Sequence, residues 1–232
     1  MSNKKVIDKF RKLIGDRNVL TKEWNKLPYS KGWRYGAGNT LAVLKPDKLS
    51  DIWRILQICV EHDIIVIMQA ANTGLTGGST PFGDDYDRPV LVINTMRINN
   101  IHIINQGSQI VGLTGSTLYD LENKLKPYGR EPHSIIGSTS IGASIIGGIC
   151  NNAGGSLVQR GPSYTEMALY AKINKNGKLE LVNELEIDLG SEPEDILDNL
   201  QNQNYKESDI RNTNRLGSDD KYSEIVREID KD

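Results

Sequence analysis

Small residues dominate one long stretch of the sequence, which runs from Gly137 to Gly161 and reads GSTSIGASIIGGICNNAGGSLVQRG. Glycine permits positive φ angles and lets another surface come into van der Waals contact. Successive backbone N–H groups in such turns can point together at an anion. A flexible, solvated linker is the simplest interpretation. The isoleucines in the stretch instead favour a packed wall beside a flat, phosphate-bearing cofactor; they are Ile141, Ile145, Ile146 and Ile149.

The first glycine-rich stretch in chain order, QAANTGLTGGST at 69–80, directly follows a predicted strand, and 137–161 is the second stretch. In open α/β layers, ligands bind beyond the carboxyl ends of the strands, where loops present backbone amides. The stretch either only reverses the chain or binds phosphate. Its glycines alternate with Asn, Thr and Ser, and this supply of hydrogen-bond donors favours phosphate. It is neither a Walker A loop nor a Rossmann fingerprint, because it lacks the P-loop lysine and does not open a helix.

The elements around this first stretch predict a βαβ unit. Residues 41–45 read as a short buried strand, and residues 64–68 read as another. Between them, apolar residues at helical spacing predict a helix capped by Ser50. A strand, a helix and a strand in succession imply a parallel pair. An earlier helix is expected over 6–14, followed by a polar lead-in.

The rest of the chain predicts a mostly antiparallel β region with flanking helices. Residues 90–93, 101–104 and 110–113 read as strands at short spacing, which favours antiparallel pairing. Thr117 is expected to cap a helix through its spacing to Asp120. The Asn-Gly pair at 176–177 predicts a hairpin between strands over 167–173 and 179–182. Ser191 and Glu194 predict a capping box for a last short helix. The fold class is α+β, with the two glycine-rich stretches facing each other across a groove.

Composition excludes several classes of function. The 232 residues are 38% hydrophobic and 25% charged, with a formal net charge of -2, so nothing favours nucleic acid or a membrane surface. Cys59, Cys150 and the three histidines make no disulfide framework or metal-ligand pattern, which fits a reducing cytoplasm and predicts no metal. No secretory signal core or membrane span is expected. We therefore expect a soluble, cytoplasmic chain.

The motifs resemble those of the quinone-dependent D-lactate dehydrogenases, flavoproteins with the PCMH-type FAD-binding fold that vanillyl-alcohol oxidases share. The resemblance covers most of the chain, from about Trp33 to Leu200. It rests on AANTGLTGGSTP (70–81), DYDRPV (85–90), GREPHSIIGS (129–138), IGASIIGGICNN (141–152) and GGSLVQRGPSYTEM (154–167). It implies that the cofactor is FAD.

The resemblance also implies which residues bind FAD. In the first stretch, the residues that match the family's pyrophosphate loop are Ala70, Ala71, Asn72, Thr73, Gly74, Gly78 and Ser79. In the second stretch, Gly137, Ser144 and Gly154 match residues that contact FAD in the family. The expected domains are an N-terminal helix and lead-in (1–35), the FAD-binding PCMH-type domain (36–207) and a polar tail (208–232). The tail ends before the family's closing strand, substrate-capping domain and membrane-binding segment.

Catalytic residues are left unassigned, because the family's acid–base groups lie mainly in the part that is missing. His133 is a tempting base, but a packing role is favoured since nothing local orients it. Arg130, Glu131 and Arg160 are equally ambiguous, with solvated or structural ion pairs as their default.

Three functions stay open. The first is the FAD-binding part of a D-lactate dehydrogenase that oxidises D-lactate to pyruvate and passes electrons to quinone, on the cytoplasmic face of the inner membrane in the intact family. The second is a truncated or split-gene fragment that binds FAD without activity, with the missing C-terminal half as a separate chain. The third is a flavin dehydrogenase for another 2-hydroxy acid, such as glycolate or 2-hydroxyglutarate. A nucleotide hydrolase is disfavoured, because no carboxylate cluster for magnesium accompanies the glycines.

Overall fold

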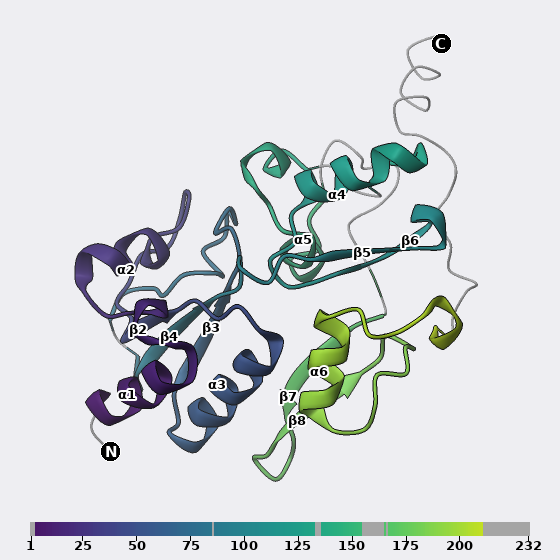
Figure 1. Ribbon diagram of the computed structural model, residues 1–232. Coiled ribbons are helices and arrows are strands. Elements are labelled where there is room, and N and C mark those ends of the chain that lie inside the picture. The colour runs from purple at the N-terminus through teal and green to yellow at the C-terminus, as the bar shows by residue number, and fades with distance from the viewer. Residues whose placement is uncertain (1–2, 85, 133–135, 155–164, 166, 211–232) are drawn as a thin grey trace.

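The computed structural model describes residues 3–84, 86–132, 136–154, 165 and 167–210. These residues form a central sheet with helices beside it, two separate β-hairpins and a second helical layer (Figure 1). No helix in these ranges is long and apolar enough to cross a membrane. The α+β class predicted from the sequence is confirmed.

Four strands form the central sheet in the order β1-β2-β4-β3. They are β1 (Val19–Leu20), β2 (Ala42–Leu44), β3 (Ile65–Gln69) and β4 (Val90–Asn94). β2 and β3 each pair with β4 in parallel, and β1 pairs with β2 antiparallel. The expected βαβ unit is therefore present, but its two strands are not neighbours, because β4 lies between them.

The prediction that residues 90–93 belong to the antiparallel region is wrong. They form β4, the central parallel strand, and all five residues of β4 are buried. A strand buried on both faces reads as a continuous apolar run, which is typical of parallel sheets. VLVI has that composition, whereas a strand with one solvated face would alternate between apolar and polar residues.

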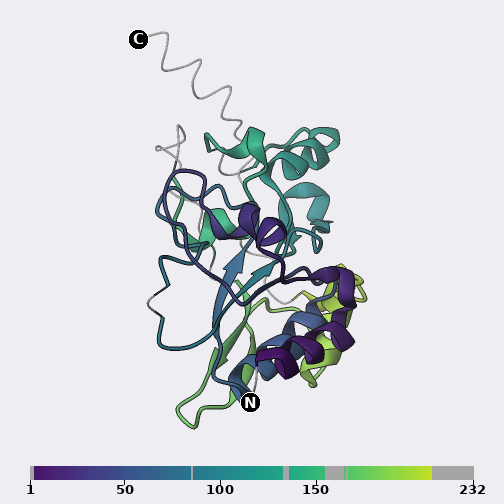
Figure 2. The ribbon, with the colours of Figure 1, turned by 90° about the vertical axis from the view of Figure 1, so that its left-hand side faces the viewer.

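Three helices pack together on the same side of this sheet (Figure 2). They are α1 (Asn3–Ile14), α3 (Leu49–Glu61) and α6 (Pro193–Gln201). Phe10 of α1, Ile55 of α3 and Leu91 of β4 are fully buried in one hydrophobic cluster, which Leu200 of α6 joins. The core of the N-terminal half thus includes a helix from the far end of the chain. The domain boundaries predicted at 36 and 208 stay predictions, and residues 211–232 of the predicted tail lie outside the described ranges.

The polar lead-in contains two elements that the sequence did not indicate, α2 (Glu23–Ser30) and β1. α2 contacts β2 and β4, while its Trp24 is 74% exposed. Lys26 is buried instead, and its ammonium donates to the carbonyl of Thr40 (2.7 Å) and pairs with Glu23 (2.7 Å). The buried face of α2 therefore carries a paired lysine. An apolar residue at that position would have given the periodic pattern by which a helix is predicted.

The second layer is built on the hairpin of β5 (Ile101–Ile104) and β6 (Gln109–Gly112), which pair antiparallel as expected. Two helices pack near it, α4 (Leu118–Leu125) and the short α5 (Ile145–Cys150). Their apolar residues form a separate, smaller hydrophobic cluster made of Ile101, Leu118, Leu121, Leu125, Ala143 and Ile145. This cluster is the floor on which the second glycine-rich stretch rests.

The predicted Asn-Gly hairpin is confirmed. It consists of β7 (Leu169–Ile173) and β8 (Leu179–Asn183), and Gly177 in its turn has a φ of 73°. The side-chain oxygen of Asn174 accepts the backbone N–H groups of Asn176 (2.9 Å) and Lys178 (3.0 Å). Short 3₁₀ turns complete the described elements: η1 (Asp16–Asn18), η2 (Asn105–Gly107), η3 (Lys126–Tyr128), η4 (Thr139–Ile141) and η6 (Glu207–Asp209).

Of the three predicted helix caps, one is confirmed and two are wrong. Thr117 caps α4 by accepting the N–H of Asp120 (3.0 Å). Ser50 instead lies buried in the first turn of α3, which begins after Lys48. Ser191 does not cap α6, because the helix begins at Pro193, whose ring already fixes a helical φ. The carboxylate of Glu194 pairs with Arg54 of α3 rather than with its own helix end.

His102 of β5 joins the hairpin layer to the C-terminal segment. It is 5% exposed, and its Nδ1 lies 2.7 Å from the hydroxyl of Tyr205. Burial, and then the nearby Lys124 ammonium, lower the pKa of His102 below its usual 6.5. Burial also raises the pKa of Tyr205 to about 12. The pair is therefore a neutral hydrogen bond near pH 7.

Acid should weaken the fold through this histidine. As the pH falls below 6.5, His102 becomes protonated in the unfolded chain while it stays neutral in the folded one. Its contribution to the free energy of unfolding is therefore fully present above that pH and declines below it. His102→Gln keeps a hydrogen-bonding partner for Tyr205 without a titrating group. Between pH 7.5 and 5.5, the free energy of unfolding measured in urea should fall more steeply in the wild type than in the variant. The difference in slope should be up to about 1.4 kcal/mol per pH unit. Identical slopes in both proteins would contradict this assignment.

Candidate cofactor site

The first glycine-rich stretch leaves the carboxyl end of β3 as a closed loop. Gln69, the last residue of β3, is 2% exposed, and its Nε2 donates to the carbonyl of Ser79 (2.7 Å), so one side chain joins the two ends of the loop. Across the loop, the Ser79 hydroxyl donates to the Asn72 side-chain oxygen (2.9 Å). The Asn72 side-chain nitrogen donates in turn to the carbonyl of Lys31 (2.8 Å). The polar side chains of Asn72 and Ser79 therefore hold the loop in shape.

The groups that remain for a ligand are backbone amides. Within the described part of the chain, no acceptor takes the backbone N–H of Ala71, Asn72, Thr73 or Gly74. Asn72 has a φ of 56°, and a left-handed residue in such a turn directs successive N–H groups to one point, where they form an anion-binding concavity. The predicted residues of this stretch thus form a loop whose donors are fixed in place and unsatisfied.

Four glycines of the predicted site are not required by the packing of the protein itself. An added Cβ would meet nothing within 4 Å at Gly78, Gly137 or Gly154, and at Gly74 only the Ser79 hydroxyl at 3.9 Å. None of the four has a left-handed φ. A dinucleotide brought close to bare backbone would account for glycine at these positions.

The second glycine-rich stretch turns through η4 and enters α5 at Ser144. Ser144 is 4% exposed, and its hydroxyl accepts the N–H of Gly147 (3.0 Å), so this predicted cofactor residue caps the helix with its side chain. Ile145 is buried in the smaller hydrophobic cluster and Ile149 packs against it, whereas Ile141 is 48% exposed, so the packing expected of the four isoleucines is confirmed only in part. Residues 155–161 of the stretch lie outside the described residues.

Hydrogen bonds through residues 113–118, which we call the belt, connect the two stretches. The hydroxyl of Thr95, just after β4, donates to the carbonyls of Gln69 (3.3 Å) and Thr114 (3.2 Å). Two residues further on, the carbonyl of Ser116 accepts the N–H of Ile145 (2.9 Å). The first stretch is thereby attached to one side of the segment 113–118, and the second stretch to the other side.

Thr114 lies in this belt with an unsatisfied group. Its hydroxyl oxygen is buried and makes no hydrogen bond to the rest of the described chain. Burying a hydroxyl without a partner costs about 1–3 kcal/mol, so a ligand that accepts or donates there would recover a real penalty. Sequence reasoning missed Thr114. Its only signal was a Thr-Gly pair after a strand, like the Thr-Gly pair at 73–74.

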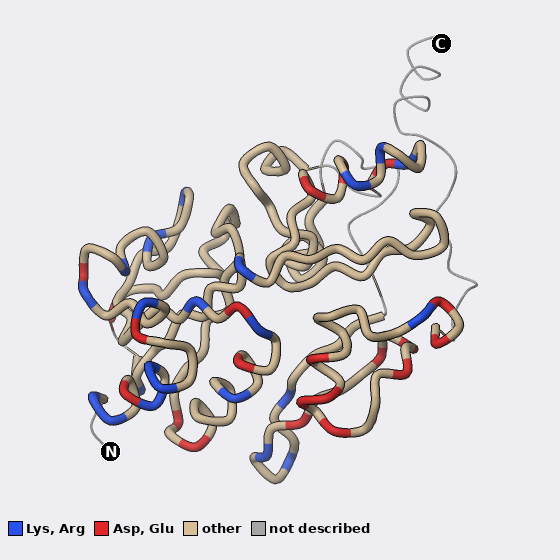
Figure 3. The backbone as a smooth tube through the Cα atoms, in the orientation of Figure 1, with Lys and Arg blue, Asp and Glu red and all other residues tan. Residues whose placement is uncertain are grey.

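The walls of the site carry no charge. Residues 64–83, 98–119 and 132–154 contain no Lys, Arg, Asp or Glu, and the tube in Figure 3 is tan over 64–83, 98–119 and 136–154. Neutral N–H dipoles held in place can bind the phosphates of a dinucleotide without cationic side chains.

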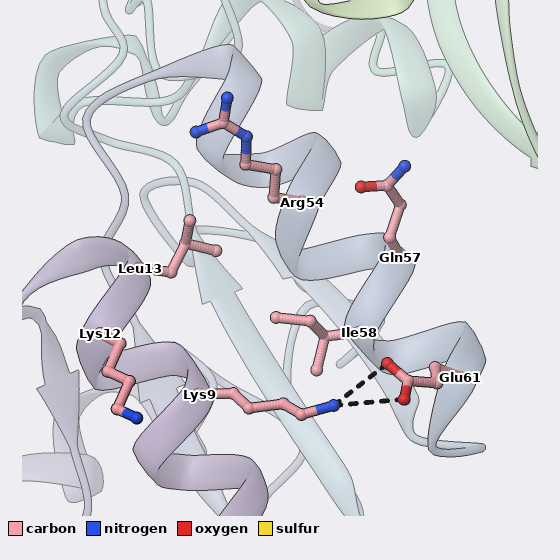
Figure 4. A pocket seen from close by; sticks show the side chains of 7 residues that line it. All are labelled: Lys9, Lys12, Leu13, Arg54, Gln57, Ile58 and Glu61. Atoms are coloured by element: carbon pink, nitrogen blue, oxygen red, sulfur yellow. Dashed lines mark hydrogen bonds and ion pairs between the residues drawn. The ribbon is translucent and has the colours of Figure 1, made fainter.

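Two surface grooves lie elsewhere. One, of about 510 Å³ between α1 and α3, is lined by Lys9, Lys12, Leu13, Arg54, Gln57, Ile58 and Glu61 (Figure 4). Lys9 and Glu61 approach to 3.2 Å across it. The other, of about 390 Å³, is lined by Asn99, Asn100, Asp120, Asn123 and Lys124. Neither contains a predicted cofactor residue, and their charged linings suit water better than a flavin ring, which needs apolar contact.

The ambiguous residues of the GREPHS motif are only partly described. His133 and Arg160 lie outside the described residues. Arg130 is half-buried, its backbone N–H donates to the carbonyl of Leu125 (3.3 Å), and its side chain packs beside Gly107 of η2. In the described ranges, no three His, Cys, Asp or Glu residues gather closely enough to hold a metal ion.

A family model described as "FAD binding domain" matches residues 40–180, which contain both glycine-rich stretches. The chain belongs to this FAD-binding domain family. FAD is therefore the cofactor that the domain implies, as the motifs predicted. The open glycines, the free loop amides and the orphaned Thr114 hydroxyl fit a flavin dinucleotide.

Comparison with curated proteins confirms the resemblance drawn from the motifs. The chain is 57% identical to the quinone-dependent D-lactate dehydrogenase of Haemophilus influenzae over 99% of its own length and 41% of that protein. It is 53% identical to the enzyme of the same name from Escherichia coli, over 99% and 40%. The chain thus spans about 40% of the length of these relatives.

Solved structures share the fold. Alkyldihydroxyacetonephosphate synthase superposes with a TM-score of 0.65 at 11% identity, over 85% of this chain and 37% of that one. p-Cresol methylhydroxylase superposes with a TM-score of 0.56 at 18% identity, over 77% and 35%. At these identities the superpositions establish the PCMH-type FAD-binding fold alone.

Proposed function

We propose that this chain is the FAD-holding part of a dehydrogenase that oxidises D-lactate to pyruvate and passes the electrons to a quinone. The observation that carries the proposal is the 57% identity to a quinone-dependent D-lactate dehydrogenase over 99% of the chain. When bound, FAD would take the hydride from the substrate carbon that bears the hydroxyl and deliver the electrons to the quinone.

The residues described above would bind and orient the cofactor. The backbone amides of 71–74 would receive the pyrophosphate, and the open faces of Gly74 and Gly78 would let it approach the main chain. On the second wall, Gly137 and Gly154 would leave room for the cofactor, while capped α5 keeps that wall in place. Ala70, Ser79 and Ser144 would act through their backbone and through the shape they impose.

The partners and the location follow from the relatives as proposals. A 2-hydroxy acid would be the electron donor and a quinone the acceptor. We propose further that the working enzyme lies at the cytoplasmic face of the inner membrane. The portion of the relatives' length beyond the match would supply the groups that contact the substrate, either in the same polypeptide or as a separate chain.

A second substrate is supported by one comparison. The chain is 26% identical over 179 residues to the D-2-hydroxyglutarate dehydrogenase of Arabidopsis thaliana. The FAD-holding part would be the same for either acid, because its walls carry backbone donors rather than groups specific for a substrate.

Visible absorbance of the purified chain tests the proposal. We expect flavin bands after incubation with FAD and gel filtration. Bleaching of these bands by D-lactate would assign the reaction to this chain, and bleaching by D-2-hydroxyglutarate instead would favour the second substrate. Retained but unreduced flavin would support an FAD-binding fragment. A chain that retains no flavin would refute the cofactor role itself.

Removing the Thr114 hydroxyl should affect stability and FAD affinity differently. Thr114→Val keeps the side-chain shape, so we expect the cofactor-free protein to be unchanged or up to about 1 kcal/mol more stable to urea. If the hydroxyl meets the cofactor, FAD binding should weaken about tenfold, the usual loss for one hydrogen bond. Unchanged affinity for FAD, measured by quenching of flavin fluorescence, would place the hydroxyl outside the contact.

A further inference from the structure

Two carboxamide side chains lie buried behind the first loop. Gln69 ends β3 and Asn94 ends β4, and the two residues are direct partners in the parallel register. They are 2% and 4% exposed. The Asn94 Nδ2 donates to the Gln69 Oε1 (3.2 Å) and to the carbonyl of Ala70 (2.9 Å). The Gln69 Nε2 donates to the carbonyls of Tyr29 (2.8 Å) and Ser79 (2.7 Å).

We propose that Gln69 and Asn94 are positioning residues for FAD, and that they act by holding the loop amides of 71–74 in the geometry that receives the pyrophosphate. This inference rests on the proposed function. Neither residue belongs to the predicted cofactor set. Both act through the loop, because their side-chain hydrogens are directed at protein carbonyls.

The bonding pattern explains why carboxamides stand here. A neutral carboxamide offers two N–H donors and an oxygen acceptor. Gln69 uses both donors to join the loop exit at Ser79 to the last turn of α2 at Tyr29, while Asn94 holds the loop entrance at Ala70. A hydrocarbon of the same size would leave buried carbonyls unsatisfied, and a carboxylate would face them with like partial charge.

Hydrogen bonds to the backbone of Gln69 also connect the first loop to the belt that holds the second glycine-rich stretch. The backbone carbonyl of Gln69 accepts from the N–H of Thr95 (2.8 Å) and from its hydroxyl (3.3 Å). The Thr95 hydroxyl also reaches the carbonyl of Thr114, in the belt that carries α5. A shift of Gln69 would therefore disturb the spacing of the two walls as well as the loop.

The experiment compares the clamp, Gln69 and Asn94, with a matched buried polar residue at the opposite end of the parallel strands. Gln69→Met removes both donors of Gln69, and Asn94→Leu removes the donors to Ala70 and Gln69 without burying a charge. Thr40→Val is the control, because Thr40 is 6% exposed and its hydroxyl donates to the carbonyl of Val90 (2.9 Å), the first residue of β4. For the full 232-residue chain and each variant, FAD affinity is measured by flavin fluorescence, amide hydrogen exchange by mass spectrometry and stability by urea unfolding.

We expect both clamp variants to exchange the amides of 70–80 faster and to bind FAD about tenfold or more weakly. The control should lose stability without either change. Unaltered exchange over 70–80 in both clamp variants, or an equal loss of FAD affinity in Thr40→Val, would overturn the positioning role. A wild-type chain that binds no FAD would defeat the proposed function instead, while hydrogen exchange would still decide whether the clamp holds the loop.

Discussion

Gly74→Val is expected to remove tight FAD binding while leaving the urea unfolding of the cofactor-free chain almost unchanged. An added Cβ meets no protein atom closer than the Ser79 hydroxyl at 3.9 Å, and the backbone at Gly74 is not left-handed. If the pyrophosphate binds the free amides of 71–74 as proposed, the branched carbons of valine would compete with it for this space. We expect affinity to fall about a hundredfold or more in a flavin-fluorescence titration, since both contact and hydrogen bonding are lost.

The control for this variant is Ser191→Val. Ser191 is exposed, uncharged and outside both walls, so the same side chain placed there should change neither binding nor stability. Gly154→Val tests the second wall, where an added Cβ meets nothing within 4 Å. Normal flavin occupancy in both wall variants would mean that the cofactor does not lie against these glycines.

Gly115→Ala should have the opposite profile and unfold the chain more easily before any ligand is added. A Cβ at this position would overlap the backbone carbonyl of Thr95 and lie 2.7 Å from the Met96 Cα, and neither can turn aside as a side chain would. The belt between the walls must then open. We expect a loss of about 3 kcal/mol in the free energy of unfolding, at the upper end of what overpacking costs.

Urea unfolding of the cofactor-free protein measures this loss directly. Excess FAD should restore part of the apparent stability of Gly115→Ala through mass action, because the variant keeps its binding groups. A variant as stable as the wild type would show that the segment 113–118 gives way more easily than its packing suggests.

Gly74 and Gly115 show what the sequence alone cannot predict. Gly74 and Gly115 both follow a threonine, and nothing in the local pattern tells which is glycine for a ligand and which for its own backbone neighbours. The motifs placed Gly74 in the cofactor set, and only the packed structure shows that Gly115 faces Thr95. Thr114, Gln69 and Asn94 were missed for the same reason, since their roles depend on partners distant in the sequence.

Local patterns predicted local structure well where no distant residue competed. The hairpin around Gly177 and the cap at Thr117 depend on neighbours within four residues, and both are confirmed. Ser50 satisfied the same capping rule and failed, because α3 begins earlier: the backbone N–H of Leu49 bonds to the side chain of Gln201 from α6 (2.6 Å). β4 was assigned to the antiparallel region because its partners β2 and β3 lie before the long segment 70–89, whereas the strand that follows it in sequence, β5, is not its neighbour in the sheet.

The return of α6 to the first helices bears on how the chain is made. Leu189, Ile196, Leu197 and Leu200 complete the cluster that contains Val6 and Phe10, and the Gln201 amide also donates to the carbonyl of Asp47 (2.9 Å). During translation, the earliest segments must therefore wait for almost two hundred later residues before their apolar faces are covered. A ribosome stalled before α6 would carry a nascent chain with that surface still open to chaperones.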